Sequence, residues 1–413
     1  MSERNPPIPS GAAEDPEVLY ARGESLDKAD AALGELARAL DSYLRAAEAG
    51  HVGACYRVGK ALLEGRGCPR DPAGAIRWLR QAAEAELGEA QALLGWCFES
   101  GTGLERHYER ALRWYAAAAA LDDPVGHFRL GELYSRGEGV ARNPEAAVRH
   151  WLRAAELGNT QAQRNLALAL AHGLGIERSH AEALHWCRKA AEAGDVDAQH
   201  NLGLLHVNAP PALRDPEEAE RWLQRAARAG LPQAQYALGR FHQRGLAVQP
   251  DPTLAFEWLR KAAEQGHIKA CYRLALAYER GLGVEISKPR AMTWMRHAAE
   301  LGSAHAQYEI GRRGLFGKVP DMLPEEAVAM LERAALQGDA RAQYAVSLCH
   351  ANGVGVSRNQ AKAYAWLALA AAQGLSRAVA KKAMMENHLT PRILLEGRKA
   401  LDAIREQLRQ DRD

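Results

Sequence analysis

Residues 232–267 read PQAQYALGRFHQRGLAVQPDPTLAFEWLRKAAEQGH, and this stretch decides the fold. Small and apolar residues recur at helical spacing from Ala234 onward, and Gly245 supplies a typical helix end. Asp251, followed by a proline, is a typical start for a second helix, which Gly266 would stop. The stretch therefore predicts an αα-hairpin with its apolar stripes facing inward.

The pattern of this hairpin recurs along most of the chain, at the 36-residue step that separates Trp222 from Trp258. Alanine and glycine follow the same step, without an insertion between Ala39 and Ala378. The tryptophans on this grid are Trp78, Trp114, Trp186, Trp222, Trp258, Trp294 and Trp366, and the two other grid points hold His150 and Met330. A period of this length predicts stacked copies of one helical unit.

Composition narrows the function classes. The chain has 53 basic and 51 acidic residues and a net charge of +2, which argues against a dedicated nucleic-acid binder. The N-terminus has no apolar signal region, and no apolar run reaches the length of a membrane helix. Six cysteines do not recur in pairs with the repeat, so reduced, packed thiols are expected. We therefore expect a cytoplasmic protein without membrane insertion.

The repeated residues resemble those of the Sel1-like repeat family, a branch of the tetratricopeptide-like superfamily. The resemblance is carried by Leu130, Gly131, Tyr134, Gly137, Gly139, Val140, Trp258, Lys261, Ala262, Ala263 and Gly266. It implies an all-α fold, a right-handed αα-superhelix of about nine full repeats with the first helix of each repeat on the concave face. It also implies a bacterial adaptor that holds protein partners and carries out no chemistry.

Four segments are expected from this register. Residues 1–16 are polar and rich in proline, so we expect them to be disordered. Residues 17–51 form a degenerate N-terminal capping repeat, and residues 52–376 form nine repeats. Residues 377–413 form C-terminal capping helices and a tail.

Several repeats depart from the pattern. Asn208–Pro211 replaces the Gly-x-Gly loop of the fifth repeat, and the stretch from Arg312 to Pro320 disturbs the eighth, so a local change of superhelical twist is predicted at both places. In the third repeat, His150 takes the tryptophan position and Trp151 is displaced by one residue, which predicts local repacking. A small residue recurs in the middle of the first helix, as at Gly239, which predicts the close approach of another helix backbone.

Variable positions of the first helices are candidate partner-binding residues. They are Arg57, Trp96, Phe128, Arg129, Asn165, Asn201, Tyr236, Tyr272 and Arg273. Asn165 and Asn201 lie one repeat apart, and stacked asparagine amides can each hold an extended peptide backbone by two hydrogen bonds. The arginines could bind carboxylates, and Trp96 lies off the tryptophan grid. The alternative interpretation is packing between repeats for the tyrosines and plain solvent exposure for the other residues.

The sequence gives little support for a catalytic, cofactor or metal site. His180, His185, Cys187, His200 and His206 lie near one another in sequence, but they lack the spacing of a zinc motif. His206, together with His242 and His350, stands where other repeats have tyrosine, which favours a packing role. No catalytic residue, cofactor or metal ligand is predicted.

Three functions were weighed. The first is a non-enzymatic scaffold that binds a protein or peptide in its concave groove. The second is a dedicated inhibitor, such as an immunity protein that neutralises a toxin, and a neighbouring toxin gene would favour it. The third is a metal-dependent enzyme, which the absence of stoichiometric metal from purified protein would exclude. The repeat architecture favours the first.

Overall fold

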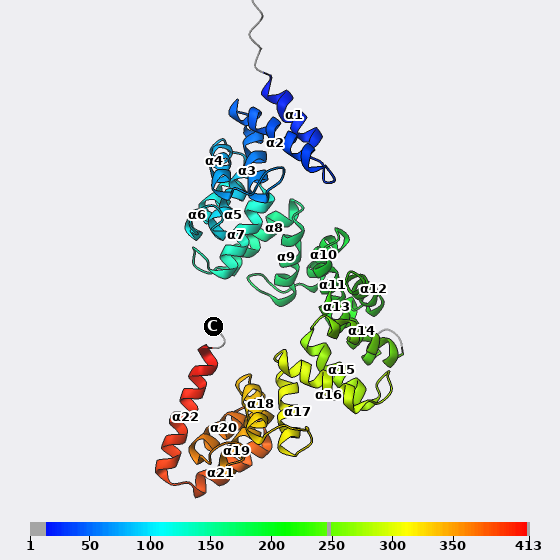
Figure 1. Cartoon of the computed structure of the whole chain (residues 1–413), viewed down its shortest axis with the longest axis vertical. Coiled ribbons are helices and arrows are strands. Elements are labelled where there is room, and N and C mark those ends of the chain that lie inside the picture. The colour runs from blue at the N-terminus through cyan, green and yellow to red at the C-terminus, as the bar shows by residue number, and fades with distance from the viewer. Residues whose placement is uncertain (1–13, 246–248, 411–413) are drawn as a thin grey trace, which may run out of the picture. The chain divides into compact units, whose positions relative to one another are not determined.

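The computed structural model describes residues 14–245 and 249–410, and every regular element in these ranges is a helix (Figure 1). On either side of residue 214, successive helices contact one another and pair as αα-hairpins. The predicted all-α fold of stacked helical hairpins is confirmed. The expectation of disorder over residues 1–16 falls mainly on residues 1–13, which lie outside the described residues.

Each repeat contributes a first helix, here called helix A, and a second helix, called helix B. The A helices are α3 Val52–Glu64, α5 Gly88–Ser100, α7 Pro124–Arg136, α9 Thr160–His172, α11 Val196–Asn208, α13 Pro232–Arg244, α15 Ile268–Arg280, α17 Ala304–Leu315 and α19 Ala340–Asn352. The B helices are α4 Pro72–Glu84, α6 Tyr108–Ala120, α8 Pro144–Glu156, α10 His180–Glu192, α12 Pro216–Arg228, α14 Pro252–Glu264, α16 Lys288–Glu300, α18 Pro324–Leu336 and α20 Gln360–Ala372.

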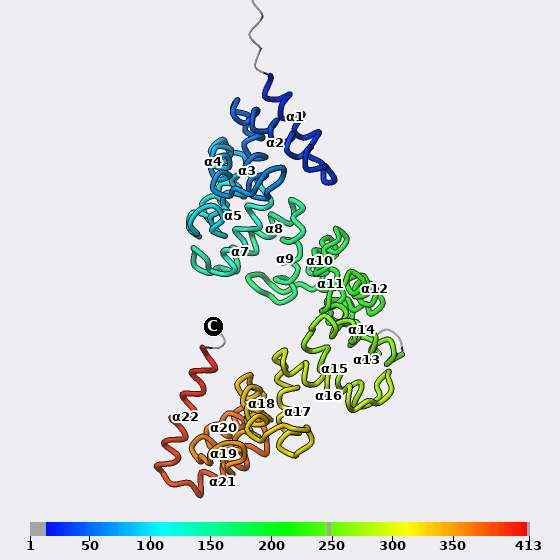
Figure 2. Tube along the Cα trace, in the orientation of Figure 1, coloured from blue at the N-terminus to red at the C-terminus, as the bar shows by residue number. Residues whose placement is uncertain are grey.

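Four further helices flank the repeats. α1 Pro16–Leu26 and α2 Leu33–Glu48 form a hairpin before the first repeat. α21 Ser376–His388 follows the last repeat, and α22 Pro391–Gln410 returns to contact α20. The chain trace in Figure 2 shows this return at the red end of the colour bar. The last described helix therefore begins at Pro391, and its role as a cap stays a prediction.

The chain divides into two compact units, one ending at Arg214 and the other beginning at Asp215. The division falls in the fifth repeat, directly after the short 3-10 helix η1 Pro211–Leu213. This is where Asn208–Pro211 replaces the usual loop glycines. The change of superhelical twist at this place stays a prediction.

The helices begin and end at the capping residues predicted from the sequence. Asp251 caps α14 by accepting a hydrogen bond from the Leu254 amide at 2.9 Å. Gly245 ends α13 with a φ of 62°, a left-handed conformation that glycine adopts at little cost. Asn143 and Asp71 cap α8 and α4 in the same way as Asp251. These helices therefore begin and end at the predicted residue types.

The small residue in the middle of helix A does meet a neighbouring helix. A Cβ added at Gly131 would meet the indole of Trp151 and the carbonyl oxygen of Ala147 on α8. At Gly239 it would meet the Leu259 side chain and the Ala255 carbonyl oxygen of α14. The close approach predicted from the sequence is confirmed, and a helix B side chain shares the space with the backbone.

This geometry explains the third repeat. Trp151 stands where most other repeats carry leucine or tyrosine, and it is only 9% exposed. His150 takes the tryptophan position and places its Nδ1 atom 3.1 Å from Nδ1 of His127 on α7. Its ring also stacks on Tyr134, with centroids 5.7 Å apart. The predicted local repacking therefore produces a half-buried histidine pair, His127–His150.

A row of buried polar groups joins successive repeats, and it was not predicted. The glutamines of this row donate a side-chain hydrogen bond to a carbonyl near the end of the preceding helix B; they are Gln91, Gln163, Gln199, Gln235, Gln307 and Gln343. Cys55 and Cys271 occupy the same position and direct their Sγ atoms to Ala47 and Ala263 carbonyls. His127 takes this position in the third repeat. These bonds fix the register between hairpins.

The eighth repeat keeps its two helices despite its altered sequence. α17 is one residue shorter than the other A helices and ends at Leu315. Gly314 stands in the usual tyrosine position, and the space beside it is occupied by the Met322 side chain from the following loop. Met330, in the tryptophan position, is half-buried against the core of the neighbouring repeat. The loop therefore supplies the atoms that the missing tyrosine would have provided.

Candidate protein-interaction surface

Two rows of side chains run along one face of the A helices. We call them the first and second inner rows. The first row holds Arg57, Leu93, Arg129, Asn165, Asn201, Ala237, Arg273, Glu309 and Ala345. The second row lies three residues further along each helix and begins in α1; it holds Glu24, Lys60, Trp96, Glu132, Leu168, Leu204, Arg240, Leu276, Arg312 and Leu348. Residues three apart share a helix face, so within each A helix the two rows lie on the same side.

The two rows meet between neighbouring repeats of the first unit. Arg57 donates a hydrogen bond to Glu24 at 3.1 Å, as an ion pair between α3 and α1. The Asn165 amide donates to Glu132 on α7 at 2.7 Å. In both cases a second-row residue bonds the first-row residue of the next A helix. Side chains of successive repeats are therefore held together on this face.

Trp96, in the second row on α5, and Arg129, in the first row on α7, hold the equivalent pair of positions. The surface between these two residues is hollowed. A pocket of about 780 Å³ lies over α3, α5 and the start of α7. Its lining residues are Tyr56, Lys60, Leu63, Glu64, Arg70, Glu89, Ala92, Leu93, Trp96, Asp123, Pro124, Val125 and Arg129. We call this the Trp96 pocket. Its volume is in the range typical of ligand pockets.

The Trp96 pocket has an apolar floor and a charged rim. Trp96 and Leu93 are half-buried and pack against the core, whereas Val125 is exposed. Lys60 and Arg129 contribute positive charge, and neither forms an ion pair with another described residue. Such a combination of tryptophan, arginine and apolar surface is typical of residues that dominate protein interfaces.

Acidic groups complete the rim. Glu64 and Glu89 are exposed, and Asp123 is buried because its side chain caps α7 through the Gly126 amide at 2.7 Å. Burial, followed by the negative charge of Glu89, raises the pKa of the Tyr56 hydroxyl to about 12. Tyr56 therefore stays neutral at physiological pH and offers a hydroxyl hydrogen-bond donor to the pocket.

The other predicted residues of the first unit have different surroundings. Phe128 is 7% exposed and belongs to the core of the third and fourth repeats. Arg57 is engaged by Glu24, and Asn165 by Glu132. Asn201 is half-buried on α11, one repeat further on. The structure thus brings together Trp96 and Arg129 in one pocket, and it places Phe128 in the interior.

In the second unit, the predicted tyrosines contact the next repeat. Tyr236 stacks on His267 with ring centroids 4.7 Å apart, and Tyr272 meets His305 edge-on at 5.7 Å. Burial raises the pKa of Tyr272. These contacts are packing between repeats, the alternative that the sequence had left open. Arg273 lies half-buried beside them on α15.

Sequence reasoning missed part of the pocket lining. Lys60, Glu89 and Val125 were not singled out, although Lys60 stands in the same row as Trp96. Reading the position three residues after each first-row residue would have found the second inner row. The polar row of Gln91 and its equivalents was visible too, since it follows the same grid as the tryptophans.

Of the five residues considered as metal ligands, only Cys187 and His206 are buried, and His242 and His350 share the position of His206 in other repeats. His242 and His350 are 2% and 5% exposed, and each lies 3.6 Å from a glutamate of the preceding helix B. The Cys187 thiol donates to the Ala198 carbonyl at 3.3 Å, and burial raises its pKa to about 12. Across residues 14–245 and 249–410, no three histidine, cysteine or acidic side chains group as metal ligands would.

Two further findings concern the whole described chain. All six cysteines are unpaired, and only Cys68 is not fully buried. None of the described helices is both long enough and apolar enough to cross a membrane.

These features define a class: a repeat protein of the αα-solenoid type. The family model for the Sel1 repeat matches nine consecutive segments, which are residues 52–87, 88–123, 124–159, 160–195, 196–231, 232–267, 268–303, 304–339 and 340–375. The chain therefore belongs to the Sel1 repeat family. The matched boundaries agree with the register read from the tryptophans.

Solved structures support the same assignment. A protective antigen of uropathogenic Escherichia coli that displays an SLR fold is 28% identical, with a TM-score of 0.62, and the match covers 95% of this chain and 92% of that one. A Sel1 repeat protein from Oxalobacter formigenes is 29% identical, with a TM-score of 0.57 and coverage of 93% and 97%. No curated protein matches the chain.

Proposed function

We propose that this protein is a non-enzymatic scaffold that binds a segment of a protein partner on its A helices, with the Trp96 pocket as the main point of contact. The observation that carries the proposal is the pocket itself. It combines a half-buried tryptophan with unpaired Lys60 and Arg129 on a face built from three successive repeats. Repeat proteins use such extended faces to hold partners.

The size of the pocket supports a side chain or short segment as its occupant. A volume of about 780 Å³ accommodates a few residues of a partner rather than a folded domain. Trp96 and Leu93 would contact the apolar part of that segment. Arg129 would bind a carboxylate or a backbone carbonyl, and the Tyr56 hydroxyl would donate a hydrogen bond.

The cytoplasm is the compartment that we propose. The support is that six cysteines stay unpaired, five of them in the core, which is the usual state of thiols in a reducing compartment. The proposal of a protein ligand also agrees with the balanced charge of +2, which provides no general attraction for nucleic acid.

Affinity purification from the native host, followed by mass spectrometry, tests this function. We expect the wild type to capture a defined partner and the Trp96→Ala, Arg129→Gln double variant to lose it. A matched control carries Arg80→Gln and Glu84→Gln on the exposed face of α4 and should capture the same partner. Equal capture by the pocket variant would contradict the proposal. Capture of one folded toxin would favour the dedicated inhibitor instead.

A further inference from the structure

The second unit carries an unusual pair on the inner rows. Arg240 of the second row and Arg273 of the first row stand on neighbouring A helices, α13 and α15. They occupy the two positions that Glu24 and Arg57 join as an ion pair. In the second unit both positions carry arginine. The pair therefore lacks the carboxylate that Glu24 provides to Arg57 in the first unit.

Nothing nearby in the described chain neutralises this pair. Arg240 donates a weak hydrogen bond to Gln243 at 3.3 Å, and Arg273 forms no ion pair among the described residues. Arg244, one turn further along α13, is exposed and also lacks an acidic partner there. Three guanidinium groups are therefore available on one face.

Two acidic residues of α15 and α17 are already engaged. Glu279 binds Arg313 at 2.7 Å. Glu309 binds Arg312 at 2.9 Å and lies 3.6 Å from Arg313. These carboxylates cannot turn to Arg240 or Arg273 without breaking the bonds that they make.

The electrostatics reflect this crowding. Burial lowers the pKa of the Arg240 guanidinium, and the positive charges of Arg273 and Arg244 lower it further. Their repulsion agrees with the register, because the equivalent Glu24 and Arg57 side chains meet at 3.1 Å. Like charges held at such positions favour the binding of an anion, because an anion converts the repulsion into charge-assisted hydrogen bonds.

We propose that Arg240 and Arg273, with Arg244 beside them, form an anion-binding site on the helix-A face of the second unit, and that its ligand is a carboxylate of an acidic protein segment. The choice of a carboxylate follows from the chain itself. In the first unit, the second-row carboxylates of Glu24 and Glu132 accept hydrogen bonds from the first-row residues Arg57 and Asn165. A partner's glutamate or aspartate would take the place of that internal group.

This site lies outside the Trp96 pocket and extends the proposed function. It rests on that function in one respect, which is that the ligand is a protein segment. An acidic segment gains affinity from bidentate guanidinium–carboxylate bonds and from steering by the local positive charge. Such binding weakens as salt screens the charges.

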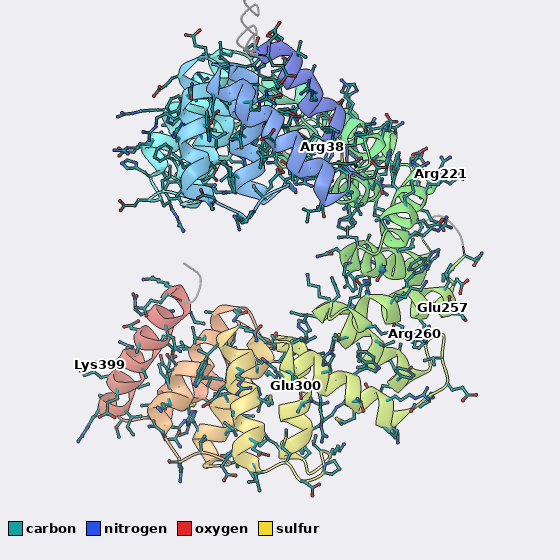
Figure 3. All side chains as sticks on the ribbon, turned by 45° about the horizontal axis from the view of Figure 1, so that its top comes forward. Arg38, Arg221, Glu257, Arg260, Glu300 and Lys399 are labelled. Carbon is teal, nitrogen blue, oxygen red and sulfur yellow. The ribbon has the colours of Figure 1, made fainter. Side chains whose placement is uncertain are left out.

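A fluorescein-labelled hexaglutamate peptide serves as the probe in fluorescence anisotropy with the full chain. We expect saturable, salt-sensitive binding to the wild type. Arg273→Gln should weaken binding by at least about tenfold, since it removes one of the two facing guanidinium groups. Arg260→Glu is the control for Arg240→Glu, because it makes the same charge change on the outer surface of α14, labelled in Figure 3. It should change the affinity less than about twofold.

Arg240→Glu separates recognition from a structural role. It recreates the order of the Glu24–Arg57 pair with Arg273, so we expect it to abolish peptide binding and to raise the melting temperature. If Arg240→Glu lowers the melting temperature, the inferred proximity of the two rows is wrong. If Arg260→Glu weakens the peptide as strongly as Arg240→Glu, the attraction is only general charge.

Two competitors test the choice of ligand. Inorganic phosphate and a six-nucleotide oligothymidylate should displace the peptide less effectively than unlabelled hexaglutamate. Stronger displacement by either would overturn the carboxylate assignment. Trp96→Ala should bind hexaglutamate like the wild type, because the two sites are separate. Failure of the wild type to bind the peptide would contradict this inference alone and would leave the partner-capture experiment unaffected.

Discussion

Replacing Gln343 by alanine tests how the repeats are held in register. The Gln343 amide donates to the Ala335 carbonyl at 3.1 Å, and its oxygen accepts from Gln373 at 2.8 Å. The side chain is 1% exposed, so water does not replace these bonds in the folded protein. The Ala335 carbonyl keeps a bond from the Gly338 amide and is not left unpaired. Two bonds at about 1 kcal/mol each predict a loss of about 2 kcal/mol.

Gln91 provides the matched comparison. It donates to the Ala83 carbonyl at 3.0 Å, but its oxygen has no hydrogen-bond partner among the described residues. Gln91→Ala should therefore cost at least about 1 kcal/mol less than Gln343→Ala. Hydrogen exchange on peptides from the two repeats measures the local free energy of opening, which suits a repeat protein better than one global transition. Equal losses for both variants would refute the reasoning.

Three other predictions follow from the core. Trp222→Ala should cost ~3–5 kcal/mol in urea unfolding because the indole is 7% exposed, whereas the half-buried Trp258 should cost less. Partial burial, followed by the neighbouring His127, keeps the pKa of His150 at about 4, below its unfolded value of 6.5, so the unfolded state binds more protons between these values. The contribution of neutral His150 to stability is complete above pH 6.5 and is lost as pH falls toward 4. His150→Trp should therefore reduce the acid sensitivity of the melting temperature, and an unchanged pH profile of the melting temperature would count against this prediction. Gly131→Ala should destabilise by about 1–3 kcal/mol because its Cβ meets an indole, while Gly34→Ala, with open space around it, should cost nothing measurable in thermal unfolding.

Much of the fold was predictable because the repeat imposes the same physical constraint several times. Asp251 and Gly245 each indicate a helix end, and their equivalents in other repeats confirm the register. The displaced Trp151 was visible in the sequence, but its consequence was not. Only the structure places His150 against His127, since two residues far apart in the sequence must meet.

The site was less predictable. Trp96 stood out because it lies off the grid, and Arg129 because it is a variable arginine, yet their common pocket depends on contacts between successive helices. The burial of Phe128 could not be predicted from its position in the repeat. Neighbouring positions on a helix can face the groove or the core, and this ring is in the core. The division at Arg214 likewise needs contacts that no sequence period contains.

A photo-crosslinking amino acid placed at Leu93, in the lining of the Trp96 pocket, tests the central claim most directly. In the native host it should crosslink one protein species, and that product should vanish when Trp96→Ala is added. The same amino acid at Glu84, on the exposed face of α4, should give no such product. Crosslinking of the same species from Glu84, or its persistence without Trp96, would contradict binding through the A helices.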